Sequence, residues 1–136
     1  MTPKFSLEHI GLAAKDTPAL KSWYERTLGA REVFCNGQQP PAYFMELPGG
    51  IWIEIYEADF AVKEVGNNHL QGWRHLALGV ESIEEAQREL EERGVVFTQP
   101  IKPAGGGGRV LFFQDPDGNL LHLVERTADS KLRRSS

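Results

Sequence analysis

The chain has 136 residues, of which 40% are hydrophobic and 25% charged, and a formal net charge of −4. These values are typical of one soluble globular domain and argue against a general attraction to nucleic acid or to an anionic membrane. The one cysteine, Cys35, cannot form an internal disulfide, and no apolar run approaches the ~20 residues of a membrane helix. We therefore expect a cytoplasmic protein without a leader peptide, a nucleic-acid partner or a membrane partner.

The first half of the chain predicts a strand, a helix and three further strands. An apolar strand opens at His9 in the run HIGLAA, and Thr17 is the expected helix cap, with Pro18 at the first helical position. Gly29 supplies the left-handed residue that ends the helix. The next three strands are expected at residues 31–34, 43–47 and 51–56.

The second half repeats this layout after a linker at residues 58–72. His75 opens the strand HLALGV, Ser82 and Glu85 have the spacing of a capping box, and Gly94 ends the second helix. Strands are then expected at residues 95–99, 110–114 and 120–125, with the turn DPDGN between the last two.

This duplication predicts a single α+β domain of two βαβββ modules. Module one covers about residues 5–57 and module two about residues 73–127, and residues 128–136 are expected to be a disordered tail. We expect the two modules to form an eight-stranded, curved, cup-shaped mixed sheet with the helices on its outer face.

Four polar residues occupy matching places in the two halves. His9 and His75 begin the first strand of each half, and Glu54 and His122 lie in the last strand of each half. Side chains alternate along a strand, so all four point away from the aliphatic residues that would pack on the helices. Two halves that each supply two ligands can surround one metal ion; the alternative is four ordinary strand residues.

Five further residues are candidates for contacts with a substrate. Aromatic side chains can line the cup and stack on an aromatic or apolar substrate, although core or interface positions are equally compatible with the pattern. Arg109, which follows the glycine run at 105–108, is a candidate to bind an anion; the alternative is a solvated side chain. The aromatic candidates are Phe44, Trp52, Tyr56 and Trp73.

With these motifs, the chain resembles the vicinal oxygen chelate superfamily, which includes glyoxalase I, methylmalonyl-CoA epimerase, extradiol dioxygenases, fosfomycin-resistance enzymes and bleomycin-resistance proteins. The matching pieces are HIGLAA, WYERTLGA, GWRHLALGV and FFQDPDGNLLHLVER, spread over roughly residues 5–127. The resemblance implies paired βαβββ modules around a divalent metal, with His9, Glu54, His75 and His122 as its ligands. It also implies a homodimer and a small-molecule substrate.

The resemblance has one departure at the metal site. At the position of His122 most catalytic relatives have a glutamate, which is the implied proton-transfer base of glyoxalase I. Three imidazoles and one carboxylate suit Zn²⁺, Fe²⁺, Ni²⁺ or Mn²⁺ and leave a divalent site with a net charge of about +1. Glu54, the remaining carboxylate, is then the candidate catalytic proton acceptor.

Three functions are compatible with this pattern. The first is a glyoxalase-like, metal-dependent lyase or isomerase that acts on a small oxygen-chelating substrate. The second is an Fe(II) extradiol-type dioxygenase. The third is a metal-free protein that binds a drug or metabolite in the aromatic cup, as bleomycin-resistance proteins do.

Overall fold

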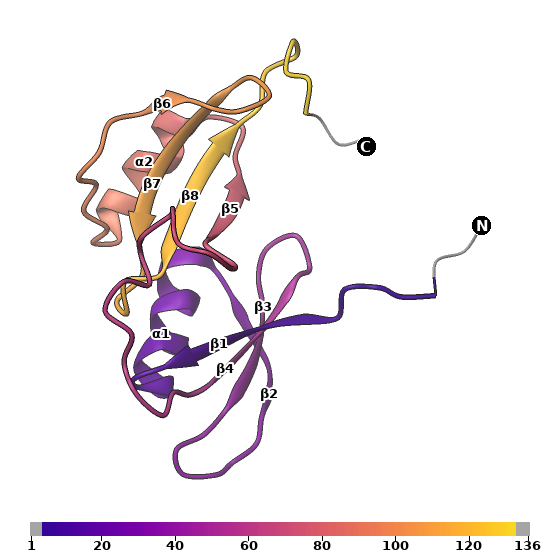
Figure 1. Cartoon of the computed structure of the whole chain (residues 1–136), viewed down its shortest axis with the longest axis vertical. Helices are drawn as coiled ribbons and strands as arrows, with labels where there is room; N and C mark the ends of the chain where they lie inside the picture. The colour runs from indigo at the N-terminus through magenta and orange to yellow at the C-terminus, as the bar shows by residue number, and fades with distance from the viewer. Residues whose placement is uncertain (1–3, 133–136) are drawn as a thin grey trace. The chain divides into compact units, whose positions relative to one another are not determined.

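The computed structural model describes residues 4–132, and the chain divides between Val62 and Lys63 into two compact units. Within the described residues, each unit is a βαβββ module with a four-stranded mixed sheet and one helix (Figure 1). The predicted fold class, α+β with two βαβββ modules, is therefore confirmed. Below, module one is the unit that ends at Val62 and module two is the unit that begins at Lys63.

Module one has the strand order β1-β4-β3-β2, in which β1 and β4 are parallel and the other pairs are antiparallel. Its helix begins one residue earlier than predicted, because the cap is Asp16, whose carboxylate accepts the Ala19 N–H at 2.9 Å. Thr17 is instead buried and donates its hydroxyl to the Pro41 carbonyl. Gly29 ends the helix at φ 73°, as expected. The elements are β1 (His9–Ala14), α1 (Thr17–Leu28), β2 (Arg31–Cys35), β3 (Tyr43–Glu46) and β4 (Trp52–Glu57).

Module two repeats the topology with the order β5-β8-β7-β6, and β5 and β8 are its parallel pair. Ser82 caps the helix by accepting the Glu85 N–H, as predicted. The turn before the last strand is fixed by Asp115, whose carboxylate accepts the N–H groups of Asp117 and Asn119. The elements are β5 (His75–Gly79), α2 (Ile83–Glu92), β6 (Lys102–Pro103), β7 (Arg109–Gln114) and β8 (Leu120–Glu125).

One predicted strand, at residues 95–99, is wrong. The chain there is irregular: Val95 donates its N–H back to Leu90 at the end of α2, and Val96 is 79% exposed. The edge strand forms later, where Lys102 and Pro103 pair with β7. Valine favours a strand only where a partner strand lies beside it, and no described strand pairs with residues 95–99.

Each sheet buries one face under its own helix. In module one the buried strand residues include Met45, Ile53 and Ile55. In module two they include Leu111, Phe113, Leu121 and Leu123. The helices contribute Leu20 and Tyr24 from α1 and Ile83 and Leu90 from α2. The other face of each sheet is therefore left for polar and aromatic side chains.

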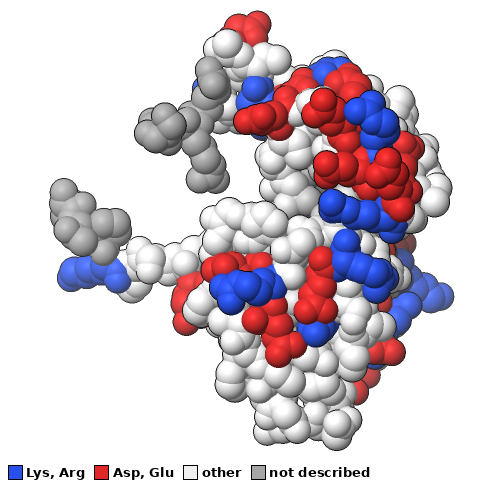
Figure 2. Space-filling model, turned by 180° about the vertical axis from the view of Figure 1, so that it is seen from behind, with Lys and Arg blue, Asp and Glu red and all other residues white. Residues whose placement is uncertain are grey.

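Surface charge, helix length and the segment after β8 complete the description of the fold. Acidic side chains gather over α2 with basic side chains among them, so this side of the molecule offers no continuous basic patch (Figure 2). None of the described helices is long and apolar enough to cross a bilayer. Of the predicted disordered tail, residues 128–132 contain a hydrogen-bonded turn at Ser130, whereas residues 133–136 lie outside the described part.

Candidate metal centre

Strand register places the two candidate ligands of each module in equivalent positions. In module one His9 pairs with Trp52 on the parallel neighbour β4, and Glu54 follows two residues later, opposite Gly11. In module two His75 pairs with Leu120 on β8, and His122 follows two residues later, opposite Ala77. Residues two apart on a strand share a face, so each pair lies on the side of the sheet that faces away from the helix.

The pair in module one is in direct contact. The Nε2 atom of His9 lies 3.4 Å from Oε1 of Glu54, and the two side chains are 35% and 32% exposed. The other ring nitrogen of His9, Nδ1, donates to the Glu8 carboxylate. A carboxylate can only accept, so Nδ1 donates in this contact, and Nε2 is the ring nitrogen that faces the Glu54 carboxylate.

The pair in module two is formed by two adjacent imidazoles whose planes are tilted by 55°. The ring centroids of His75 and His122 are 4.8 Å apart. His75 donates from Nδ1 to the side-chain oxygen of Asn68 at 2.7 Å, and His122 donates from Nδ1 to the Leu123 carbonyl at 3.1 Å. Both partner atoms are acceptors, so in the neutral form of each ring Nε2 is the nitrogen with the lone pair. An Nδ1 hydrogen bond to an oxygen is the usual support of a metal-binding histidine.

Burial keeps His122 in the form that a metal requires. The residue is 7% exposed. Burial lowers the pKa of its imidazole below the ordinary value of 6.5, and the nearby His75 and Arg126 lower it further, against the opposing effect of the Leu123 hydrogen bond. The ring is therefore neutral near pH 7, and only the neutral ring has a lone pair for a metal.

Three of the predicted aromatic residues surround the ligand pair of module one. Phe44 pairs with Glu54 across the sheet and packs edge-on against the His9 ring at 4.9 Å. Trp52 lies on the same face and donates from Nε1 to Glu46 at 3.2 Å. Tyr56 covers Gly11, where an added Cβ would meet the tyrosine ring at 3.2 Å. These contacts make an aromatic wall beside His9 and Glu54.

The fourth aromatic candidate, Trp73, is placed differently. It precedes β5 and is 98% exposed, so it forms no part of a wall within module two. Phe112 takes that place instead, with ring distances of 4.7 Å to His122 and 6.0 Å to His75. A signal for Phe112 was present in the sequence, because it lies ten residues before His122 just as Phe44 lies ten residues before Glu54.

The structure places Arg109 on the helix side of its sheet, opposite the face of His122. It pairs with Glu125 across the β7–β8 ladder, and its guanidinium bonds the carboxylates of Glu84 and Glu125. Glu125 also accepts the Ile83 N–H at the start of α2. Arg109 therefore ties helix α2 to β8 on the face away from His122.

This cluster predicts a measurable acid sensitivity. The Ile83 N–H and the Arg109 guanidinium lower the pKa of Glu125 below its ordinary value of 4.5. A lowered pKa in the folded state means stabilisation that is complete above about pH 4.5 and is lost as the pH falls through the folded value. We expect Glu125→Gln to be less stable than the wild type at pH 7, with the difference in unfolding free energy shrinking below pH 4.5. Urea denaturation at pH 7, 5, 4 and 3 measures it, and a constant difference contradicts the assignment.

Each module taken by itself supplies two candidate ligands. Within neither described unit do three or more histidine, cysteine, aspartate or glutamate side chains gather to hold a metal ion. A structural or catalytic metal needs at least three protein ligands in most sites. Neither module by itself therefore provides a complete set of metal ligands.

Comparison with known proteins supports the same family. The model of the Glyoxalase/Bleomycin resistance protein/Dioxygenase superfamily matches residues 6–123. Fosfomycin resistance protein FosX of Listeria monocytogenes is 28% identical over 133 residues, which cover 94% of this chain and 95% of FosX. The protein YwkD of Bacillus subtilis is 30% identical over 125 residues, which cover 89% of this chain and 97% of YwkD.

Solved structures agree with this result. A mutant of Listeria monocytogenes FosX complexed with Mn(II) and 1S,2S-dihydroxypropylphosphonic acid has a TM-score of 0.69 and 25% identity, over 94% of this chain and 95% of that one. A glyoxalase family protein from Enterococcus faecalis has a TM-score of 0.75 and 29% identity, over 88% of this chain and 97% of that one. The duplicated βαβββ fold, the family-model match and these relatives show that the chain belongs to the Glyoxalase/Bleomycin resistance protein/Dioxygenase superfamily.

Proposed function

We propose that the chain is a metal-dependent enzyme of the glyoxalase type, which binds one divalent transition metal through His9, Glu54, His75 and His122. The observation that carries this proposal is that each module, by the same strand register, brings its own two ligands together on the face away from its helix. The Mn(II) complex of the related FosX supports a divalent metal.

The donor set fits a transition metal better than a hard oxygen-binding cation. All three imidazoles have Nδ1 bonded to an oxygen, so Nε2 is the nitrogen that each would offer to a metal, and the fourth donor is a carboxylate. This mixture suits Zn²⁺, Fe²⁺, Ni²⁺ or Mn²⁺, whereas Mg²⁺ and Ca²⁺ favour oxygen ligands throughout. A divalent ion here would polarise an oxygen of the substrate and stabilise negative charge on it.

The protein groups around the site indicate which substrate would bind. Glu54 is the single carboxylate among the four proposed ligands, so we assign it the role of proton acceptor in a lyase or isomerase reaction. Phe44, Trp52 and Tyr56 would cover an apolar part of the substrate beside it and exclude water. The substrate class is therefore a small molecule with chelating oxygens and an apolar side.

One observation favours a second candidate, an Fe(II) dioxygenase of the extradiol type. His9, His75 and Glu54 are the two histidines and one carboxylate that non-haem Fe(II) oxygenases use. The aromatic wall next to His9 and Glu54 would suit a flat aromatic substrate. In this reading His122 is a neighbour of the iron and not one of its ligands.

Elemental analysis followed by two assays separates the candidates. We expect about one transition-metal ion per chain after purification without chelators, as four-ligand sites of this kind bind metal tightly. Isomerase turnover of a 2-oxoaldehyde hemithioacetal that does not require O₂ supports the first candidate. Oxygen consumption with catechol and Fe²⁺ supports the second. Protein that stays metal-free after incubation with Zn²⁺, Mn²⁺ and Fe²⁺ refutes both and leaves a binding protein.

A further inference from the structure

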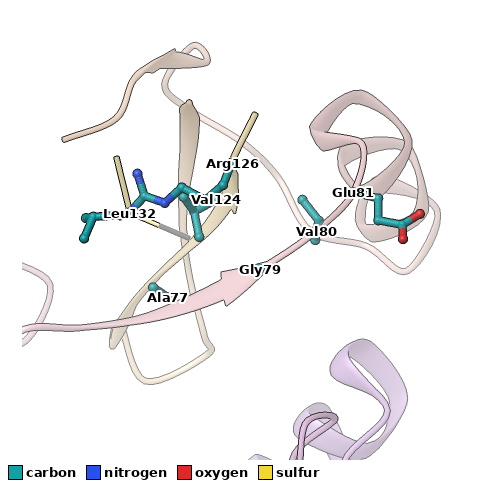
Figure 3. Close-up of a pocket in the computed structure, with 7 residues that line it drawn as sticks. All are labelled: Ala77, Gly79, Val80, Glu81, Val124, Arg126 and Leu132. Atoms are coloured by element: carbon teal, nitrogen blue, oxygen red, sulfur yellow. The ribbon is translucent and has the colours of Figure 1, made fainter. Parts of the chain in front are cut away.

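Module two has an open cavity on the same face of its sheet as His75 and His122. Its volume is about 780 Å³, which is within the usual range for small-molecule sites. Ala77, Gly79 and Val124 form its floor on β5 and β8, and Leu132 and Arg126 close one end (Figure 3). Ala77 pairs with His122, and Gly79 pairs with Val124, so the floor continues directly from the proposed metal ligand.

The internal repeat shows that this space is particular to module two. In module one the position equivalent to Val124 is Tyr56, whose ring lies over Gly11. In module two an added Cβ on Gly79 would meet no atom within 4 Å. The same sheet face is thus filled by an aromatic ring in one module and left open above small residues in the other.

Arg126 is held at the end of this cavity with its charge uncompensated. Arg126 lies two residues after Val124 and four after His122, so its side chain is on the same face of the sheet as theirs. The side chain of Glu125 is on the opposite face, which packs against helix α2. The Nη1 atom of Arg126 donates to the carbonyls of Gly105 and Gly107 at 2.6 and 2.7 Å. Carbonyl acceptors fix a guanidinium without neutralising it, and Arg126 has no ion pair with any residue from 4 to 132. Glu81, the acidic lining residue, lies at the opposite end of the cavity (Figure 3).

We propose that this cavity binds the anionic group of a small substrate, a carboxylate or a phosphonate, and that Arg126 is its cationic partner. The planar guanidinium keeps donors free beyond those on the two carbonyls, and such donors match the oxygens of these groups. The inference rests on the metal site proposed above, which would hold the other, chelating end of the same molecule. The substrate class becomes a small molecule with chelating oxygens at one end and an anionic group at the other.

Titration of metal-free protein with methylphosphonate tests the cavity by itself. Calorimetry and the ¹H–¹⁵N signal of the Arg126 side chain should both report saturable binding. Arg126→Gln should weaken this binding by about tenfold or more, because a charge-assisted contact is lost. Gly79→Val, which fills open space on a strand without a strained backbone, should weaken it to a similar degree. Arg88→Gln, on the exposed surface of α2, is the matched control and should bind as the wild type does.

The same variants distinguish failure of this inference from failure of the proposed function. Arg126→Gln and Gly79→Val should each retain one zinc ion per chain, because neither residue is a proposed ligand. Methylphosphonate binding that is absent in the wild type, or unchanged in Arg126→Gln, overturns the inference whatever the zinc content. Binding that follows the variants as expected in a protein that takes up no zinc supports the inference and refutes the metal site. Circular dichroism of each variant verifies the fold.

Discussion

Replacing His75 by alanine is expected to lower the affinity for Zn²⁺ or Mn²⁺ by on the order of 10²-fold and to abolish turnover. The substitution removes one of the two adjacent imidazoles in module two and also the Nδ1 group that donates a hydrogen bond to Asn68. His75 is an exposed residue on an edge strand, so the fold should remain intact. Metal content by elemental analysis and affinity by calorimetry measure the effect.

His69→Ala is the matched control for this experiment. His69 lies in the loop that precedes β5 in module two, and among the described residues only its backbone N–H makes a hydrogen bond, which the Asn67 side chain accepts. The chain has four histidines, so this variant removes the imidazole that is not a proposed ligand. Metal affinity should be unchanged. If His75→Ala keeps the metal content of the wild type, or if His69→Ala loses it, the assigned ligand set is wrong.

Replacing Gly108 by alanine is expected to destabilise module two by about 3 kcal/mol or more. Gly108 has φ +101°, and an added Cβ would lie 2.0 Å from the Glu125 carbonyl oxygen. The obstacle is backbone, which cannot move without displacing the end of β8, where Glu125 binds both Arg109 and the start of α2. Soluble yield and urea denaturation measure the loss of stability.

Gly105→Ala, in the same glycine run, is the control that separates this steric clash from a general sensitivity of the loop to substitution. No atom lies within 4 Å of an added Cβ on Gly105, and its φ is not positive. Its stability should stay within about 0.5 kcal/mol of the wild type. Equal stability of the Gly105→Ala and Gly108→Ala proteins would show that the described contact between Gly108 and Glu125 is incorrect.

Most of the fold could be predicted because local and periodic signals agree. The caps at Ser82 and Gly29 and the DPDGN turn each act over a few residues, and the same layout recurs in both halves of the chain; the structure has each of these features. The two wrong predictions concern features that depend on residues far away in the sequence. Residues 95–99 have strand-forming side chains but no strand to pair with. Asp16 caps helix α1, whereas the Thr17 hydroxyl donates to the Pro41 carbonyl.

For the candidate site, the alternation of side chains along a strand predicts which face of the sheet each residue occupies. Alternation alone put His9, Glu54, His75 and His122 on the faces away from the helices, and the register has each pair side by side. The same rule applied to β7 and β8 would have placed Arg109 with Glu125 on the helix face. The support that Asn68 gives to His75 could not be predicted, because it comes from an irregular loop whose path no periodicity describes.

X-ray absorption at the metal edge of the zinc- or manganese-loaded protein tests the central claim most directly. The account predicts one ion per chain with multiple scattering from about three imidazole rings and nitrogen or oxygen neighbours near 2.0–2.2 Å. In the His122→Ala protein the imidazole contribution should fall to about two rings. A shell made of oxygen alone, or an imidazole count that does not change in this variant, would contradict a metal held jointly by the ligand pairs of the two modules.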